Sequence, residues 1–198
     1  FRHIIGASEY AKLHDLAFMC TVFIPKDVEK IAPFVDRYKV ASLEAKSQDL
    51  FDAYQKVPHK TLYVSTGCLT EEELFTVKYL WEDYRYVVEF LHCTAVYPAP
   101  ARTLNLRCLK EYFLEGFSDH STSIIAGALA VIAGAEVIEK HVRADGCPEN
   151  DPDYGHSLTL SRFAEYVGHV RYAEKAIGDG EKRLDDLEQP LVEHRVTR

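Results

Sequence analysis

The chain has 198 residues, of which 47% are hydrophobic and 27% are charged, and this is enough ordinary chain to bury one well-packed core. Its formal net charge of −8 argues against a broad surface for nucleic acid or another polyanion, so an anionic ligand would need a local cluster of positive groups. No apolar run approaches the roughly 18 residues that span a bilayer, so we expect no membrane partner. No secretory leader is evident, and the five cysteines form no CxxC pair. We therefore expect a cytoplasmic protein with reduced thiols and no nucleic-acid partner.

Amphipathic stretches alternate with short apolar runs along the whole chain. Apolar residues at helical spacing predict helices, and short β-branched runs predict strands. One helix has a clear start, because Thr70 is an N-cap residue and Glu73 completes a capping box with it. The predicted elements in chain order are helix 8–16, strand 17–23, helix 28–35, strand 38–41, helix 48–55, strand 61–65, helix 71–84, strand 87–94, helix 104–113, strand 116–118, helix 124–133, strand 136–142 and helix 160–177.

Six predicted strands are each followed by a helix, which predicts parallel βαβ units. An open doubly wound sheet and a (β/α)₈ barrel both fit this pattern. The doubly wound sheet is disfavoured because no GxGxxG or phosphate-loop glycine pattern opens a helix. In a barrel, the C-terminal strand ends form one rim that carries the active site. Polar residues end all six strands: Thr21, Ser42, Ser65, Thr94, Ser118 with His120, and His141.

We therefore predict an α/β fold, a (β/α)₈ TIM barrel of which six of the eight βα units are visible, over residues 1–180. Residues 181–198 are strongly charged and are predicted to be a linker toward an absent segment. The chain begins with Phe1 and not with Met, so an upstream segment is expected to be missing as well.

Two histidines, His120 and His141, end neighbouring predicted strands. Period-two alternation places Ser118 on the face of His120, and Glu139 on the face of His141. If both faces point inward, two imidazoles meet at the rim with a carboxylate close behind, which suits a borderline metal such as Mn²⁺ or Zn²⁺. Two ligands are fewer than a structural zinc site uses, so water or substrate would complete the shell. The alternative is that each histidine caps its strand and hydrogen-bonds a loop.

Lys39 lies in an otherwise apolar strand, where a lysine is rarely buried without a partner. Its ammonium is therefore expected to meet an anion, unless it extends to solvent at the strand end. Together with rim hydroxyls it would form a cradle of phosphate size. These hydroxyls belong to Thr21, Ser42, Ser65 and Ser118.

Glu44 and Asp153 are the loop carboxylates nearest to the predicted rim. They could bind hydroxyl groups or transfer protons, and the alternative is that both are simply solvated. His92 and Cys93 lie within a predicted strand, where a packed core pair is favoured over a nucleophile and its base.

Between about residue 8 and residue 180, a series of short motifs follows in a fixed order. The motifs are Tyr38-Lys39-Val40-Ala41-Ser42, Val64-Ser65-Thr66-Gly67, Leu91-His92-Cys93-Thr94, Tyr97-Pro98-Ala99-Pro100, Asn105-Leu106-Arg107, Ser118-Asp119-His120, Val137-Ile138-Glu139-Lys140-His141, and Asp151-Pro152-Asp153 with Ser157. In these motifs the chain resembles the N-acetylneuraminate (sialic acid) synthase family, which includes legionaminic and pseudaminic acid synthases and spore-coat polysaccharide relatives. The motifs are specific to the family and not to the sugar.

The resemblance implies a (β/α)₈ barrel followed by a small antifreeze-like domain that caps the partner's barrel in a homodimer. It implies condensation of phosphoenolpyruvate with an N-acetylated amino sugar, with C–O cleavage and release of phosphate. His120 and His141 would bind Mn²⁺ or Mg²⁺, and would be catalytic together with Lys39 and Glu44. Phosphoenolpyruvate would contact Thr21, Lys39, Ser42, Ser65 and Ser118, and the amino sugar would contact Glu44 and Asp153.

The chain also departs from the family pattern. Ala95 stands where the family usually has Asn or Ser as a phosphate contact, Leu43 replaces a customary Gly, and Ser121 replaces a Thr. The family's first two βα units and its capping domain have no counterpart here. The chain is therefore expected to be part of such a synthase, or else a degenerate barrel that binds a sugar or a protein partner without catalysis. A third reading, another phosphoenolpyruvate-dependent aldol-type synthase, is disfavoured by the strand ends at His120 and His141.

Overall fold

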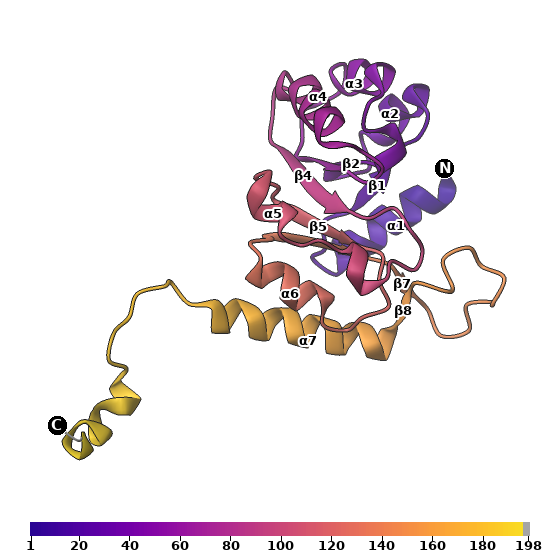
Figure 1. Cartoon of the computed structure of the whole chain (residues 1–198). Helices are drawn as coiled ribbons and strands as arrows, with labels where there is room; N and C mark the ends of the chain where they lie inside the picture. Colours follow the sequence, from indigo (N-terminus) through magenta and orange to yellow (C-terminus); the bar gives the residue numbers. More distant parts are fainter. Residues whose placement is uncertain (196–198) are drawn as a thin grey trace.

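The computed structural model describes residues 1–195 as a curled parallel sheet covered by helices (Figure 1). The main elements are α1 Arg2–Leu13, β1 Met19–Thr21, α2 Pro25–Ile31, β2 Arg37–Val40, α3 Gln48–Tyr54, β3 Leu62–Ser65, α4 Glu71–Glu82, β4 Val88–Cys93, α5 Cys108–Glu111, β5 Gly116–Asp119, α6 Ala126–Ile132, β6 Val137–Lys140, β7 Val142–Arg143, β8 Leu158–Thr159 and α7 Leu160–Ile177. Short 3₁₀ helices lie at η1 Ser42–Glu44, η2 Ala101–Thr103 and η3 Asp186–His194.

The six main strands pair in sequence order, from β1 to β6, and every pairing is parallel. The predicted βαβ units, their number and their order are thus confirmed. The sheet curls strongly, and this curl brings Lys39 on β2 to Glu139 on β6 across the concave face, 3.6 Å from Nζ to Oε2. Among the described residues, β1 and β6 are not paired, so the observed architecture is a six-stranded half-barrel and not a closed barrel.

Strands β3 and β5 are buried on both faces, as parallel strands are when the sheet is covered on both sides, whereas the two edge strands β1 and β6 are only partly buried. All four residues of β3 and all four of β5 are buried. Neighbouring strands approach so closely at Gly116 that a Cβ there would lie 2.3 Å from the Leu91 side chain and 2.8 Å from the Val137 carbonyl. On the helix side, the Trp81 indole is fully buried and donates to the Ala45 carbonyl at 2.8 Å.

The helix boundaries show which sequence signals were sufficient to predict where a helix begins and ends. The capping box is confirmed, since the Glu73 amide donates to Thr70 Oγ1 and the Thr70 amide donates to Glu73 Oε2. The extent of the predicted helix 104–113 was wrong, because Asn105 and Phe113 adopt positive φ values of 39° and 51° that interrupt helical geometry. Only α5 remains of it. The first helix begins at Arg2, well before the predicted residue 8.

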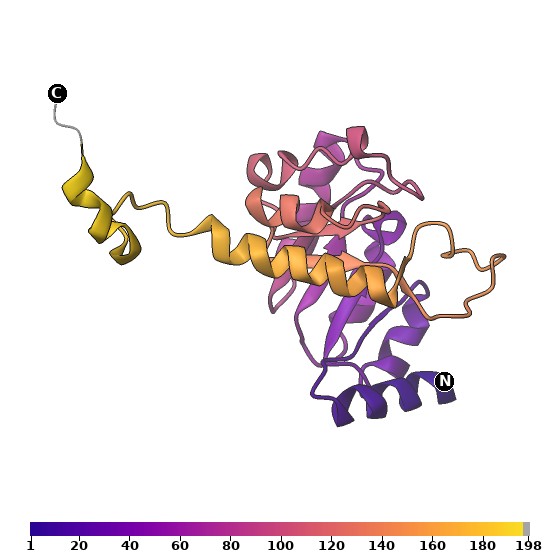
Figure 2. The same cartoon turned by 90° about the horizontal axis from the view of Figure 1, so that it is seen from below.

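Two features near the C-terminus were not predicted. The short strands β7 and β8 pair in parallel and close the loop 144–157 at its base. The predicted linker contains η3, which begins with an Asp185 capping box and extends away from the body (Figures 1 and 2). Residues 196–198 of that linker lie outside the described residues. None of the described helices is both long and apolar enough to cross a membrane.

Candidate functional site

A hollow of about 180 Å³ opens at the C-terminal ends of the strands, on the concave face of the half-barrel. It collects most of the rim residues that the sequence indicated. Its lining includes Thr21, Lys39, Ser42, Ser65, Ser118, His120 and His141, together with Phe23, Ala41, Tyr97 and Glu139. Residues from five different strands or strand ends therefore converge on one small space, which we call the rim pocket.

Lys39 forms the floor of the rim pocket. The residue is 3% exposed, so the alternative in which it extends to solvent is wrong. Its ammonium donates to Ser65 Oγ at 2.7 Å and to the Val40 carbonyl at 3.2 Å, and it lies 3.6 Å from Glu139 Oε2. The expected anion partner is thus a carboxylate of the protein itself. A buried ammonium that is held by oxygens but only partly neutralised is suited to a small oxyanion.

Glu139 contacts polar side chains from two other strands across the rim pocket, Ser118 on β5 and Lys39 on β2. Ser118 Oγ donates to its Oε2 at 2.6 Å, on the same carboxylate oxygen that faces Lys39. Strand alternation predicted that Glu139 lies near the histidines, but no binding role was predicted for it. The same alternation, applied to Lys39 and Ser118, was the available signal for its contact with them.

Ser42 is held at the pocket edge by a backbone donor. The Gly67 amide donates to Ser42 Oγ at 3.1 Å, and a Cβ on Gly67 would lie 2.9 Å from that oxygen. Cys93 faces the same region, with Sγ 3.6 Å from Ser42 Oγ. Burial raises the pKa of the Cys93 thiol, so it packs as a neutral group and not as a thiolate nucleophile.

His120 is a neutral imidazole with a fixed tautomer. Because a carbonyl can only accept, its contact of 3.0 Å to the Thr94 carbonyl places the proton on Nδ1. The lone pair is therefore on Nε2, which lies 3.3 Å from Ser118 Oγ in the pocket. Burial is the main cause of a lowered His120 pKa. The Tyr97 ring stacks on the imidazole with centroids 4.2 Å apart.

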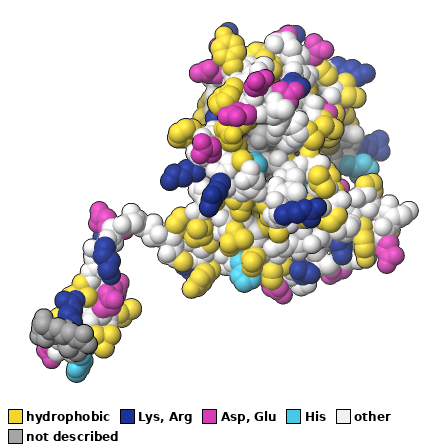
Figure 3. Space-filling view, in the orientation of Figure 1, with side chains coloured by type: hydrophobic (Ala, Val, Ile, Leu, Met, Phe, Trp, Pro, Cys, Tyr) yellow, Lys and Arg dark blue, Asp and Glu magenta, His cyan; other side chains and the backbone are white. Residues whose placement is uncertain are grey.

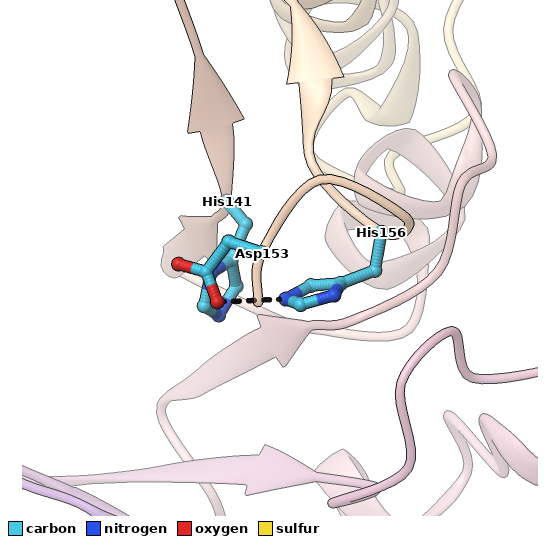
Figure 4. A group of neighbouring side chains, drawn as sticks. All are labelled: His141, Asp153 and His156. Atoms are coloured by element: carbon cyan, nitrogen blue, oxygen red, sulfur yellow. Dashed lines mark hydrogen bonds and ion pairs between the residues drawn. The ribbon is translucent and has the colours of Figure 1, made fainter. Parts of the chain in front are cut away.

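His141 faces a second group of polar side chains on the loop between β7 and β8 (Figure 4). Its Nδ1 lies 3.3 Å from Asp153 Oδ2, and its ring centroid lies 4.6 Å from that of His156 and 5.3 Å from that of His120. His156 was not among the predicted site residues. Its spacing of three residues from Asp153, in a turn-forming loop that directly follows His141, was the available signal.

The alternate residues of the same strands point away from the pocket, as alternation requires. Asp119 and Lys140 form a fully buried ion pair, with Nζ 3.3 Å from Oδ2. Tyr166 on α7 donates to the same Oδ2 at 2.9 Å, and the Ser121 amide donates to Oδ1 at 2.8 Å. This network fixes the ends of β5 and β6, and so the positions of His120 and His141.

Glu44 and Asp153 do not line the rim pocket. Glu44 lies in η1, where its Oε2 is buried without a hydrogen-bond partner among the described residues. Asp153 lies on the loop, with its side chain 58% exposed. Their predicted role toward a second ligand stays a prediction.

A larger hollow, of about 780 Å³, lies elsewhere, between β6, α6 and α7. Apolar side chains such as Val131, Phe163 and Ile177 line much of it. Figure 3 shows hydrophobic side chains gathered over this part of the surface. Its cations are already paired, Lys140 with Asp119 and Arg171 with Glu174, and its lining includes no histidine, so we take the rim pocket as the candidate functional site.

A model of the NeuB family matches residues 3–182. Pseudaminic acid synthase of Campylobacter jejuni is 37% identical over 195 residues, which cover 95% of this chain and 55% of that protein. N,N'-diacetyllegionaminic acid synthase of Legionella pneumophila is 33% identical over 197 residues, covering 93% of this chain and 54% of that protein. The chain thus spans about half the length of these relatives.

The fold is shared with a solved structure. The N-acetylneuraminic acid (sialic acid) synthetase of Leptospira borgpetersenii superposes with a TM-score of 0.83 at 24% identity. The match covers 98% of this chain and 70% of that chain.

Proposed function

The chain belongs to the NeuB family, and from this premise we propose that it condenses phosphoenolpyruvate with an N-acetylated amino sugar, giving a nonulosonic acid and phosphate. Its relatives are synthases of such acids, including pseudaminic and legionaminic acid. The observation that carries the proposal is the rim pocket, where Lys39 and several hydroxyls converge beside two histidines.

Lys39 and its surrounding hydroxyls would bind phosphoenolpyruvate. Ser65 Oγ accepts from Lys39, so its own proton is free to donate to the ligand, whereas Ser118 donates to Glu139 and would have to turn its hydroxyl toward the ligand. Preorganised donors stabilise the charge that grows on a leaving phosphate without reorganising in the reaction. In this proposal Thr21 and Ser42 supply further contacts at the pocket edge.

The histidine pair fits the divalent metal that the family implies. Neutral imidazole nitrogens bind divalent first-row metal ions, and the fixed tautomer of His120 directs a lone pair into the pocket. Such an ion, when bound, would act as a Lewis acid toward the carbonyl of the open-chain sugar.

The condensation requires few groups from the protein. The enol carbon of phosphoenolpyruvate bonds to the sugar aldehyde carbon, and the aldehyde oxygen takes up a proton to become a hydroxyl. A water oxygen bonds to C2 of the former phosphoenolpyruvate and gives up a proton, and the C2–O bond to phosphate breaks so that phosphate leaves. Glu139 can accept the proton of that water, since its carboxylate borders the pocket. Glu44 and Asp153 would bind the sugar, and the active form would be a homodimer.

The experiment is a phosphate-release assay on the full chain with phosphoenolpyruvate, Mn²⁺ and a panel of N-acetylated hexosamines. We expect release only when all three components are present, and a loss of roughly a hundredfold or more in kcat for Lys39→Gln. Lys26→Gln is the matched control, because Lys26 is exposed. Unchanged turnover in Lys39→Gln contradicts the proposal.

One observation favours a second candidate, a barrel that binds such ligands without turning them over. Ala95 offers no hydrogen-bond donor, and it lies beside Gly67 and Ser42, with its Cβ 3.0 Å from a Cβ built on Gly67. Binding of phosphoenolpyruvate without phosphate release, in both the chain and an Ala95→Asn variant, would support this second candidate.

A further inference from the structure

Three cysteines of the chain line one hollow of about 210 Å³ next to the rim pocket. Cys68 belongs to the turn after β3, Cys93 ends β4 and Cys108 begins α5. All three are free thiols, but Cys68 is exposed, Cys108 is partly exposed and Cys93 is buried. Oxidants reach exposed thiols first. Thiols that share a hollow but differ in exposure can therefore react in a fixed order.

The pairing of β3 with β4 brings Cys68 close to Cys93. The Thr66 amide donates to the Leu91 carbonyl at 3.0 Å, so the parallel register continues beyond the last residue of β3. In that register Gly67 lies opposite Cys93, and Cys68 follows one residue later. Because neighbouring strands lie about 4.8 Å apart and rise about 3.3 Å per residue, the Cα atoms of Cys68 and Cys93 are roughly 6 Å apart. A disulfide spans about 4.4–6.8 Å between Cα atoms.

The Cys93 sulfur also lies over the residue that precedes Cys68. A Cβ built on Gly67 would lie 3.1 Å from Cys93 Sγ. Cys68 itself has a φ of 61°, in the left-handed region that few residues other than glycine adopt. Such a residue departs from the alternation of a strand, so its side chain is not forced to the face opposite Cys93. The bond therefore requires movement of an exposed turn and not of the buried sheet.

We propose that Cys68 and Cys93 form a reversible disulfide in the presence of hydrogen peroxide, so that the pair is an oxidation site beside the rim pocket. The Cys68 thiolate attacks one peroxide oxygen and the O–O bond breaks. Cys68 becomes a sulfenic acid, and the other oxygen takes up a proton and leaves as water. The Cys93 sulfur then bonds to the Cys68 sulfur, the S–O bond breaks, and the hydroxyl leaves with the Cys93 proton as water. Two thiols are oxidised, and one peroxide is reduced to two waters.

The surroundings of the thiols set the order of these steps. Burial raises the pKa of the Cys93 thiol, so Cys93 by itself reacts slowly with peroxide. Cys68 is exposed and reacts first. Cys108 is the competing partner in the hollow, but it lies on α5 and not on the strand paired with β3, and its sulfur accepts from Asn105 Nδ2 at 3.1 Å. The strand register therefore favours Cys93 as the second thiol.

The disulfide would displace two residues of the turn and strand that support the rim pocket. Cys93 Sγ lies 3.6 Å from Ser42 Oγ and 3.7 Å from His120 Nδ1. The Gly67 amide, which directly precedes Cys68, donates to Ser42 Oγ at 3.1 Å. Movement of either cysteine therefore shifts the surroundings of Ser42, a proposed contact of phosphoenolpyruvate. This consequence rests on the proposed function, whereas the disulfide itself does not.

The test treats the folded full chain with hydrogen peroxide, alkylates the remaining thiols in denaturant and maps the peptides by mass spectrometry. We expect one bridge within the chain, between Cys68 and Cys93, that costs two hydrogens of intact mass and is reversed by a dithiol. Cys147→Ser is the matched control, because Cys147 lies on the loop between β7 and β8 and its loss should leave the bridge unchanged. No bridge, a bridge from Cys68 to Cys108, or a bridge between two chains overturns the inference.

A second variant tests the order of reaction without disturbing the buried site. Cys68→Ser changes only an exposed thiol, so the protein should fold. Under the same peroxide treatment its Cys93 should remain a free thiol, because no exposed partner starts the reaction. Oxidation of Cys93 in the folded Cys68→Ser protein contradicts the proposed order.

Binding of phosphoenolpyruvate separates this inference from the proposed function. Calorimetry should give a Kd roughly fivefold weaker for the oxidised chain than for the reduced chain, as expected for the loss of about one hydrogen bond. Peroxide-treated Cys68→Ser should keep the Kd of the reduced wild type. If the bridge forms and the Kd is unchanged, the oxidation site stands and its link to Ser42 is wrong. If neither form binds phosphoenolpyruvate, the proposed function fails while the mapped bridge stands.

Discussion

The two halves of the candidate site are built in different ways. The strand half consists of Lys39, Ser65 and Ser118, which are 2–3% exposed; Lys39 donates to Ser65, and Ser118 donates to the partly buried Glu139. The loop half consists of Asp153, with its side chain 58% exposed, and His156 on the turn between β7 and β8. A site fixed by strand register changes little when surface residues change, whereas a loop can vary in sequence and length. We therefore expect the strand half to bind the ligand common to the family, and the loop half to distinguish sugars.

The largest effect on stability is expected from Lys140→Met, because Lys140 pairs with Asp119 on the side of β5 and β6 that faces away from the pocket. It leaves Asp119 charged in a site where both side chains are at most 2% exposed. Loss of one partner from a buried pair should lower the free energy of unfolding by about 3 kcal/mol or more. Urea unfolding measures this change, with the exposed Lys175→Met as control. A change below about 1 kcal/mol would show that the strand half does not depend on this pair.

A smaller effect is expected from Tyr166→Phe, which removes the hydroxyl that donates to Asp119 at 2.9 Å. A hydrogen bond to a charged group contributes about 1.5–3 kcal/mol. The urea midpoint should fall accordingly, and the exposed Tyr172→Phe should leave it unchanged. Equal urea midpoints for Tyr166→Phe and Tyr172→Phe would mean that the hydrogen bond from α7 does not stabilise the end of β5.

The corresponding change in the loop half should hardly affect stability. Asp153→Asn keeps the size of the side chain and removes an exposed charge, so the unfolding free energy should change by less than about 1 kcal/mol. A large loss of stability would mean that the loop is part of the folded core, and the contrast between the halves would fail.

The smallest effect concerns pH, at a histidine outside both halves. Burial lowers the folded-state pKa of His92 below its ordinary value of 6.5. Below about pH 6.5 the unfolded chain takes up a proton that the folded protein does not, so stability falls as the pH falls toward the folded pKa. His92→Gln should show a shallower loss between pH 7.5 and 5.5 in urea unfolding. An identical pH slope in the variant contradicts a neutral His92.

The sequence predicted the parts of this site that follow from local rules. Strand alternation was sufficient to align Ser118 with His120, and capping chemistry was sufficient to begin α4 at Thr70. The alternation of strands and helices and the end of α7 at Ile177 followed in the same way. Each of these depends on residues that are close in the chain.

The remaining features depend on contacts between distant segments. The anion partner of Lys39 is Glu139, which comes near only because the sheet curls, and no local pattern encodes the degree of curl. His156 meets His141 only because β7 and β8 pair and close the loop. The interruption of the predicted helix 104–113 depends on left-handed backbone at residues that have no strong preference against a helix.

Titration of phosphoenolpyruvate into the full chain by calorimetry, without added metal, tests the central claim most directly. The claim is that the strand half binds the anion and the loop half does not. We predict that Lys39→Gln weakens the Kd at least tenfold, while Asp153→Asn keeps the wild-type value. An unchanged Kd in Lys39→Gln, or an equal loss in both variants, would contradict the account.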